Sequence, residues 1–419
     1  MSNSTYLMNL SSGNIVPITT KKGQSYVDVD TNINALLNLT LSPMTAPRYR
    51  IYILNADDTI REELPLEDML SSGSFSENYQ SGQRCSLSLT LSNGDGKYTP
   101  NIDQLWVGTK MRFDAGIEQY DGGIIWVQKG IFVITSVQPN YSPGTQTVSI
   151  SLGDKFSELE SGAGKMQMAY EVPRDSSIKA VVKELLGMPK GDGGPLDYQE
   201  PYFSPAIAIK KTQAKINKSA GDTVGSLILD LAAHAGAEVF YNAQGRLTFL
   251  PLNAAGDDND KPILFNYETA RGDLGDLNFS FDYSNIINKI ILVGATVDGG
   301  VVRGEAENSD ALSPLNTSRI GVRPSVVNAS EVKTKIVAEE NARYQLRKNL
   351  VLKTNVSLSV PYNPLIGVNN LITITNEFFE LVKQNFLIQS VSFSLDYNAN
   401  MSISVSNLNN LPFIASYKR

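Results

Sequence analysis

The sequence predicts an α+β protein that is mainly β, with two related β-barrel domains and an α+β domain inserted after the first. Three observations lead to this prediction. Alternating apolar and polar residues, the pattern of a half-buried strand, recur near both ends of the chain, whereas helical periodicity is concentrated in the middle. One series of strand-like segments also occurs twice, in residues 85–152 and in residues 355–405.

The two copies of this series keep the same order. An alternating segment is followed by proline, by an apolar segment and by a Phe-x-Ile-x-Ser-Val block, which begins at Phe132 in the first copy and at Phe386 in the second. A Ser-Ile-Ser segment closes each copy. Chance similarity of short alternating strands is the alternative explanation. A true repeat indicates part of a built object, such as a ring, rather than a catalyst.

The N-terminal part of the chain divides into an arm and a β domain. Residues 1–45 are rich in Ser, Asn and Thr, and predict an arm or accessory strands that need a neighbour for stability. Residues 46–160 predict the first β-barrel domain. Its strands are expected at residues 48–54, 85–91, 107–115, 123–137 and 146–152.

Residues 161–255 predict an α+β insert. A helix is expected over residues 175–187, since apolar residues follow at helical spacing between an Asp or Ser cap and Gly187. A second helix is expected over about 222–235, followed by another glycine, and then a hairpin with its turn at 242–245.

The remaining residues predict a link and a second barrel. Residues 256–350 are expected to hold strands, a long polar connection over 304–330, and a helix from 331 to about 349 that Ser330 caps. Residues 351–419 predict the second β-barrel domain.

Composition limits the possible functions. The chain has 419 residues, enough for about two to four domains. Its apolar stretches are much shorter than the about 20 residues of a membrane span, and its first residues do not resemble a signal peptide. We therefore expect no membrane anchor and synthesis in a cytoplasm.

The scarcity of Cys and His limits the chemistry. Cys85 is the one cysteine, and its alternating surroundings favour a buried apolar role over a reactive thiol. His234 is the one histidine, and its place near a helix end favours a dipole interaction over a catalytic base. Multi-Cys and multi-His metal sites are excluded. We predict no catalytic residues, no cofactor and no metal site.

Several short motifs resemble known binding motifs but lack the residues that those motifs require. The Gly-Lys pairs at Lys97 and Lys165 lack the early Gly and the following Ser or Thr of a phosphate-binding loop, and therefore predict turns. Residues 257–260 lack the Gly and Glu of a calcium loop, and the Arg-Gly-Asp at 271–273 predicts a turn. Carboxylate pairs for glycoside hydrolysis stay possible, but no particular pair is indicated.

The charge balance is acidic. The 43 Asp and Glu against 36 Lys and Arg give a net charge of −7, and no basic stripe with interleaved aromatic residues occurs. Because affinity for nucleic acid comes mainly from phosphate neutralisation, tight binding is not expected, whereas passage of nucleic acid without adhesion is compatible.

Taken in order, these segments resemble the phage tail baseplate hub proteins, also called tail-tip hub proteins. The resemblance covers about residues 47–410, whereas residues 1–45 match nothing in the family. The similar segments are residues 92–101, 105–113, 129–137 and 148–154 for the first barrel, 221–251 for the insert, and 288–294 and 338–346 for the C-terminal half. No C-terminal lysozyme or peptidase module is visible.

The resemblance implies two tube-type β-barrel domains with inserted α+β domains, in a homotrimer that joins the six-fold tail tube or a distal tail protein to a three-fold spike or tip protein. The ring would surround the route of DNA and the tape-measure protein, in a virion assembled in the host cytoplasm, and would serve DNA ejection and host cell entry. DNA would pass without specific binding. Two barrels in each of three chains would resolve the six-to-three symmetry mismatch. An acidic lining would repel phosphates.

Two other functions stay open, a tail-associated cell-wall hydrolase and a host-carbohydrate-binding tail protein. The scarcity of His and Cys disfavours the hydrolase. A carbohydrate receptor would need exposed aromatic platforms, whereas Trp106 and Trp126 lie in or beside predicted strands.

Overall fold

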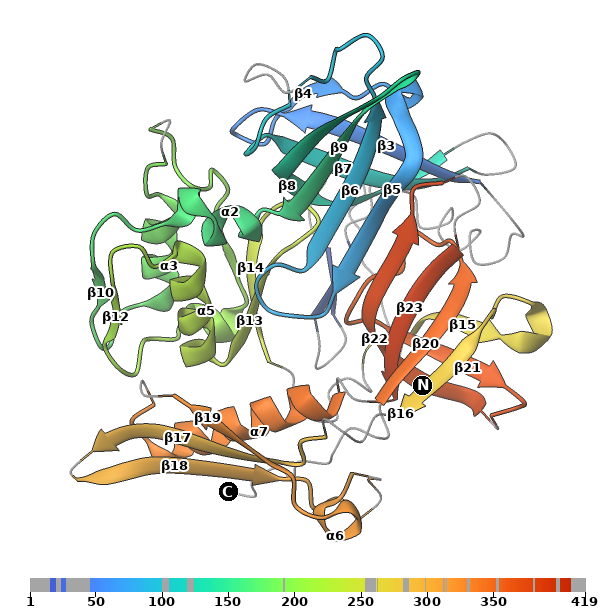
Figure 1. Cartoon of the computed structure of the whole chain (residues 1–419). Coiled ribbons are helices and arrows are strands. Elements are labelled where there is room, and N and C mark those ends of the chain that lie inside the picture. The colour runs from blue at the N-terminus through green and yellow to red at the C-terminus, as the bar shows by residue number, and fades with distance from the viewer. Residues whose placement is uncertain are drawn as a thin grey trace.

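The computed structural model describes most of the chain and confirms the predicted class, α+β and mainly β (Figure 1). The described residues are 16–19, 24–27, 46–99, 105–118, 124–190, 193–252, 261, 263–281, 286–297, 299–311, 313, 315–329, 332–351, 354–379, 381–396 and 400–407. Within them, every helix is too short or too polar to span a membrane.

One sheet of thirteen strands contains both predicted β units. The strands of the N-terminal half are β3 (Pro47–Leu54), β4 (Ile60–Glu63), β5 (Met69–Asn78), β6 (Cys85–Ser92), β7 (Lys110–Glu118), β8 (Ile124–Ser142) and β9 (Thr145–Asp154). Those of the C-terminal half are β15 (Ile263–Glu268), β16 (Leu277–Phe281), β20 (Thr354–Pro361), β21 (Leu371–Asn376), β22 (Leu381–Ser394) and β23 (Asn400–Asn407). The halves meet where β5 pairs with β22.

The two halves repeat strand for strand. The antiparallel order β6-β9-β8-β7 in the first is matched by β20-β23-β22-β21 in the second. Phe132 and Phe386 pair with equivalent positions at the ends of β9 and β23, and both long strands bulge two residues later, after Ile134 and after Ile388. The predicted repeat, with Phe132 and Phe386 at equivalent positions, is therefore confirmed.

The turns before β7 and β21 also match. Gly108 and Asn369 both have a positive φ, and the backbone N–H of each donates 2.9 Å to the carbonyl of Ile134 and Ile388 respectively. The flanking strands differ in direction, because β3 runs antiparallel to β7 whereas β15 runs parallel to β21. The repeat therefore includes the conformation of a turn, which short strand patterns alone do not specify.

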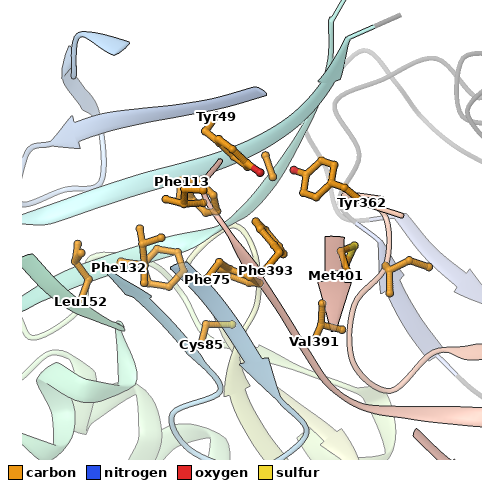
Figure 2. Close-up of a cluster of buried hydrophobic side chains, with 14 of the residues drawn as sticks. Tyr49, Phe75, Cys85, Phe113, Phe132, Leu152, Tyr362, Val391, Phe393 and Met401 are labelled. Atoms are coloured by element: carbon orange, nitrogen blue, oxygen red, sulfur yellow. The ribbon is translucent and has the colours of Figure 1, made fainter. Parts of the chain in front are cut away.

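One hydrophobic core serves both β units, which are therefore not independent barrels. Figure 2 shows aromatic side chains from both halves meeting in it. The ring centroids of Phe75 and Phe393 are 5.0 Å apart, and those of Tyr49 and Tyr362 are 5.9 Å apart. Since each buried aromatic side chain contributes about 1.5–3 kcal/mol, the shared core couples the folding of the two halves.

The insert forms a separate α+β unit with its own core. Its larger elements are α2 (Phe156–Glu160), α3 (Ile178–Leu186), α5 (Val224–Ala235) and the hairpin of β13 (Ala237–Tyr241) and β14 (Leu247–Pro251). Its short elements are η2 (Gly162–Gly164), β10 (Tyr170–Val172), β11 (Tyr202–Phe203), α4 (Pro205–Ala208) and β12 (Ile216–Lys218). Ser177 caps α3 and left-handed Gly236 ends α5, so both predicted helices and the hairpin are confirmed.

A third unit corrects the prediction for residues 304–330. This range was expected to be a connection, but it holds the end of β18 (Gly300–Glu307), α6 (Thr317–Ile320) and β19 (Pro324–Asn328). With β17 (Lys289–Val297) these strands form a three-stranded sheet, and α7 (Lys335–Val351) packs on β17 and β18. The sequence of β18 and β19 is mostly polar or exposed, because α7 covers only one face of this small sheet, and it was therefore read as a connection.

The start of the third helix was also predicted wrongly. Lys335, not Glu331, is its first residue. Buried Val332 forms a turn instead, since its N–H donates 2.9 Å to the carbonyl of Ala329. Ser330, the predicted cap, lies outside the described residues.

Few residues of the predicted arm are described. They form a hairpin of β1 (Val16–Thr19) and β2 (Gln24–Val27). The acidic residues 257–260 lie outside the described residues. The remaining elements are the single turns η1 (Leu66–Asp68) and η4 (Thr269–Arg271), the latter where a turn was predicted for Arg-Gly-Asp.

Candidate assembly site

The junction between the two halves is a fully formed strand pairing. Residues 74–78 of β5 pair antiparallel with residues 390–394 of β22, with Phe75 opposite Phe393. Both of these rings are buried. The junction therefore combines a backbone ladder with an apolar contact, as an interface between two separate chains does.

A tyrosine from the first half fixes the end of the junction. The Tyr49 hydroxyl shares its one proton between the backbone carbonyls of Ser394, at 3.2 Å, and Asp396, at 3.3 Å. Burial raises the pKa of Tyr49 well above its usual value, and the nearby Asp396 carboxylate raises it further. The phenol therefore stays neutral and keeps its proton for donation.

The same chain carries both halves of a second, unfilled junction. In β22 the first residues pair with β21 and the last with β5, whereas in β8 only residues 124–133 pair with β7. Among the described strands, residues 136–142 of β8 pair with β9 alone, and β16, the equivalent of β5, pairs with β20 alone. The unpaired edge of β8 is thus equivalent to the edge of β22 that pairs with β5. The unpaired edge of β16 is equivalent to the edge of β5 in the same pairing.

One face of the continuous sheet is covered with small polar side chains, and we call it the hydroxyl face. Its positions lie opposite one another in the strand pairings and alternate with the buried core residues. They are Ser74, Ser76, Asn78, Ser86, Ser88, Thr90, Ser136, Gln138, Asn140, Thr147, Ser149, Ser151, Ser357, Ser359, Ser390, Ser392, Ser394, Ser402 and Ser404. None of these positions carries a charge, and all are exposed or half-buried.

Buried ions fix the insert on the first β unit. The Lys155 ammonium lies 2.7 Å from a carboxylate oxygen of Asp58 and 2.7 Å from one of Asp197, and donates to the carbonyl of Gly245 at 2.9 Å. Burial alone would raise the pKa of Asp58, but the ammonium groups of Lys155 and Lys110 outweigh it and hold this pKa below its usual value. The group is therefore charged at neutral pH.

A second buried pair lies beside this network. Arg84 of the first β unit donates 2.8 Å to Glu238 of β13, and both side chains are less than a tenth exposed. The guanidinium also stacks 3.5 Å from the ring centroid of Phe240. Two ionic contacts thus set the orientation of the insert, and sequence spacing gave no sign of either.

The residues weighed for chemistry lie apart from one another. Cys85 is buried in β6, where burial raises the pKa of its thiol, and His234 lies in the last turn of α5. Trp126 lies in β8 with the Arg50 guanidinium 4.4 Å from its ring centroid, and Trp106 is half exposed just before β7. The structure therefore assembles no site from them.

His234 lines a small pocket. The pocket lies between the end of α5 and the start of α7 and has a volume of about 30 Å³. In the described parts of the chain, no three His, Cys, Asp or Glu side chains are grouped as metal ligands would be. Lys97 lies in a turn, as predicted, and the predicted turn before Lys165 is η2, after which Lys165 forms a β-bridge with Thr223.

The fold, two equivalent β units joined in one sheet with an α+β insert, is that of phage tail proteins. The 43 kDa tail protein of prophage MuSo2 from Shewanella oneidensis superposes with a TM-score of 0.55 at 16% identity, over 87% of this chain and 100% of that one. A tail protein from Neisseria meningitidis MC58 gives 0.57 at 13% identity, over 87% and 99%.

A third solved structure has a similar fold. A chain of the lidless PdpA–VgrG complex superposes with a TM-score of 0.52 at 10% identity, over 90% of this chain and 67% of that one. No family model and no curated protein sequence matches this chain. The likeness therefore lies in the fold alone.

Proposed function

We propose that the chain is a structural phage tail protein, a baseplate hub that forms a homotrimeric ring of six β units around a channel. The fold it shares with tail proteins supports the class. The observation that carries the ring is the pair of matching unfilled edges on β8 and β16. Since exposed strand edges are normally paired or covered, a head-to-tail ring that pairs them accounts for both.

The filled junction specifies the register of the new one. Asn278 of β16 is equivalent to Ser74 of β5, because they pair with the equivalent residues Ser357 and Ser88. Asn140 of β8 is likewise equivalent to Ser394. Because Ser74 lies opposite Ser394, we expect Asn278 to lie opposite Asn140 of the partner subunit.

A proline on the β8 edge gives this junction one ladder bond fewer. In the filled junction the N–H of Leu395 donates to the carbonyl of Gly73, and the N–H of Tyr79 donates to the carbonyl of Gln389. Hydrogen-bonded pairs occur at every second residue of an antiparallel ladder, so Phe393, opposite Phe75, is also in a hydrogen-bonded pair. Its equivalent in β8 is Pro139, which lacks an N–H. The loss costs about 1 kcal/mol and protects the free edge from pairing with unrelated strands.

The ring would connect parts of different symmetry at the tail tip. Its six similar units face the six-fold tail tube or a distal tail protein, and its three chains face a three-fold spike or tip protein. DNA and the tape-measure protein pass through the channel during ejection and host cell entry. The chain acts without catalysis, as a component of the virion that is assembled in the host cytoplasm.

Cysteine cross-linking in assembled particles tests the ring. We expect a chain carrying Asn278→Cys and Asn140→Cys to give covalent dimers and closed trimers under oxidation, since opposed residues of this type lie within disulfide range. The intrachain pair Ser74→Cys with Ser394→Cys is the matched control and should form within monomers. Buried Cys85 does not compete. Absence of cross-links, or a ladder beyond three chains, would contradict the proposal.

The described residues give the hydrolase alternative no specific support, and of the two tryptophans weighed for carbohydrate binding only Trp106 is exposed. Purified protein should leave host cell wall intact in a zymogram and should bind no sugar on a glycan array. Cell-wall degradation that a single carboxylate substitution abolishes would support the hydrolase instead.

A further inference from the structure

The hydroxyl face crosses the filled junction without interruption. The Ser76 and Ser86 hydroxyl oxygens lie 2.7 Å apart, and Ser76 is also directly opposite Ser392 across the junction. The strands β8-β9-β6-β5-β22-β23-β20-β16 follow one another through the chain. If the ring closes by repeating the junction, these eight strands form an unbroken belt. The hydroxyl face covers one side of seven of them, and Asn278 of β16, which lies opposite Ser357, continues it.

The other side of the belt is closed by a second layer. Strands β7, β3 and β4 continue the sheet from β8, β21 and β15 continue it from β22, and the shared core fills the space between the layers. The second layer is broken, because β4 and β15 end in edges that the described strands do not join, and the exposed charged residues of β4, Arg61, Glu62 and Glu63, discourage pairing at its edge. In two concentric layers the outer layer has the longer circumference. With a similar number of strands available, gaps are therefore expected in the outer layer. The unbroken belt is therefore the inner layer.

The size of the belt fits a channel. Eight strands in each chain, about 4.8 Å apart, give three chains a circumference of roughly 115 Å, which corresponds to a diameter of roughly 37 Å before strand tilt widens it. Serine side chains are short and leave most of this diameter open. Such a bore admits a DNA duplex.

The chemistry of the face differs from that of the whole chain. Charged residues make up 19% of the sequence, yet none occupies the hydroxyl face. Serine does not especially favour strands, so secondary structure alone does not account for its repetition here. Its hydroxyl holds water and carries no charge, so a polyanion beside it neither releases counterions nor meets repulsion.

We infer that the hydroxyl face is the wall of the channel and lets DNA pass without electrostatic attraction or repulsion. This inference rests on the proposed ring. It replaces the acidic lining suggested by net charge with a neutral one. Ejection of DNA through this ring should therefore respond to charge placed on the wall and not to charge placed elsewhere on the chain.

Lysine substitutions test the wall in complete particles. Ser88→Lys and Ser392→Lys each place three cations around the bore, whereas Asn217→Lys places them on exposed β12 of the insert as a control. We expect the two wall variants to slow DNA ejection severalfold at low salt and to recover at high salt, because phosphate contacts are screened. Ejection rates equal to those of the control at every salt concentration would overturn the inference.

Thiol labelling separates this inference from the ring itself. In particles whose hub layer is assembled, Ser88→Cys should react with a small maleimide but not with a maleimide on a polymer too bulky to enter the bore, whereas Asn217→Cys should react with both. Reaction of Ser88→Cys with the bulky reagent on an intact three-chain ring would sink the inference alone. Failure to assemble three chains would instead count against the proposed function.

Discussion

At the scale of single residues, the buried ions are the least predictable feature of the chain. Asp58, Lys155 and Asp197 are far apart in sequence, and each would pass for a surface charge when the sequence is read alone. Their side chains are nearly inaccessible, and Lys155 together with Lys110, which also pairs with Asp58, balances the two carboxylates. By contrast, the burial of Cys85 and the helix-end position of His234 followed from local pattern, and both predictions are confirmed.

Removing one ion of the network should destabilise the chain strongly. Asp197→Ala leaves the Lys155 ammonium with one carboxylate fewer and deprives the Tyr241 hydroxyl of its acceptor. We expect the free energy of unfolding to fall by about 3–5 kcal/mol in urea denaturation. Lys183→Ala, which breaks the exposed pair with Glu200, is the control and should change it by less than about 1 kcal/mol. Equal effects of the two substitutions would contradict the account.

Asp154 should make stability depend on pH. Burial raises the pKa of Asp154 to about 6, although three backbone N–H groups favour its charged form. Because the folded pKa exceeds the unfolded value of about 3.9, its contribution is complete below pH 4 and is lost as the pH rises through 6, by up to about 3 kcal/mol. Asp154→Asn should flatten the change in unfolding free energy between pH 4 and 7. An unchanged pH profile would show that the group does not titrate in this range.

At the scale of elements, local pattern identified the repeat but not its junction. The Phe-x-Ile-x-Ser-Val blocks marked equivalent strands because alternation and bulge position are local. The pairing of β5 with β22 joins residues more than 300 positions apart, which no local pattern encodes. β19 was missed because both its termini and one face are polar or exposed. The alternating serines of the hydroxyl face were visible in the sequence. That they all lie on one side of one sheet could be seen only from the strand order of the structure.

The junction should make the two β units unfold together. Phe393→Ala removes a ring that contacts Phe75 and Tyr49 of the other half and Tyr362 of its own half, and should cost about 3–5 kcal/mol. We expect both β units to unfold in one shifted transition, followed by intrinsic fluorescence and circular dichroism. Phe378→Ala removes an 86% exposed ring and should leave the transition in place. Two separate transitions in the Phe393 variant would mean that the units fold independently.

At the scale of the whole molecule, the chain combines a shared β core with units that have cores of their own. Deleting about residues 165–255 and bridging the gap with a short Gly/Ser linker should leave the β core folded, because the insert packs around a separate cluster. The deletion removes the acidic partners that Lys155 and Arg84 have in the insert. Adding Lys155→Met and Arg84→Met should therefore raise the stability of the deleted chain. Cooperative loss of both β units, measured by circular dichroism, would show that the insert belongs to their core.

The central claim is that one chain supplies two of six β units in a closed ring. Imaging of the hub layer in an assembled particle, with enough detail to count chains, tests it most directly. We expect three copies, six similar β units, a central channel, and β16 of each chain beside β8 of the next. A layer of two or six copies, or one without a central channel, would contradict the account.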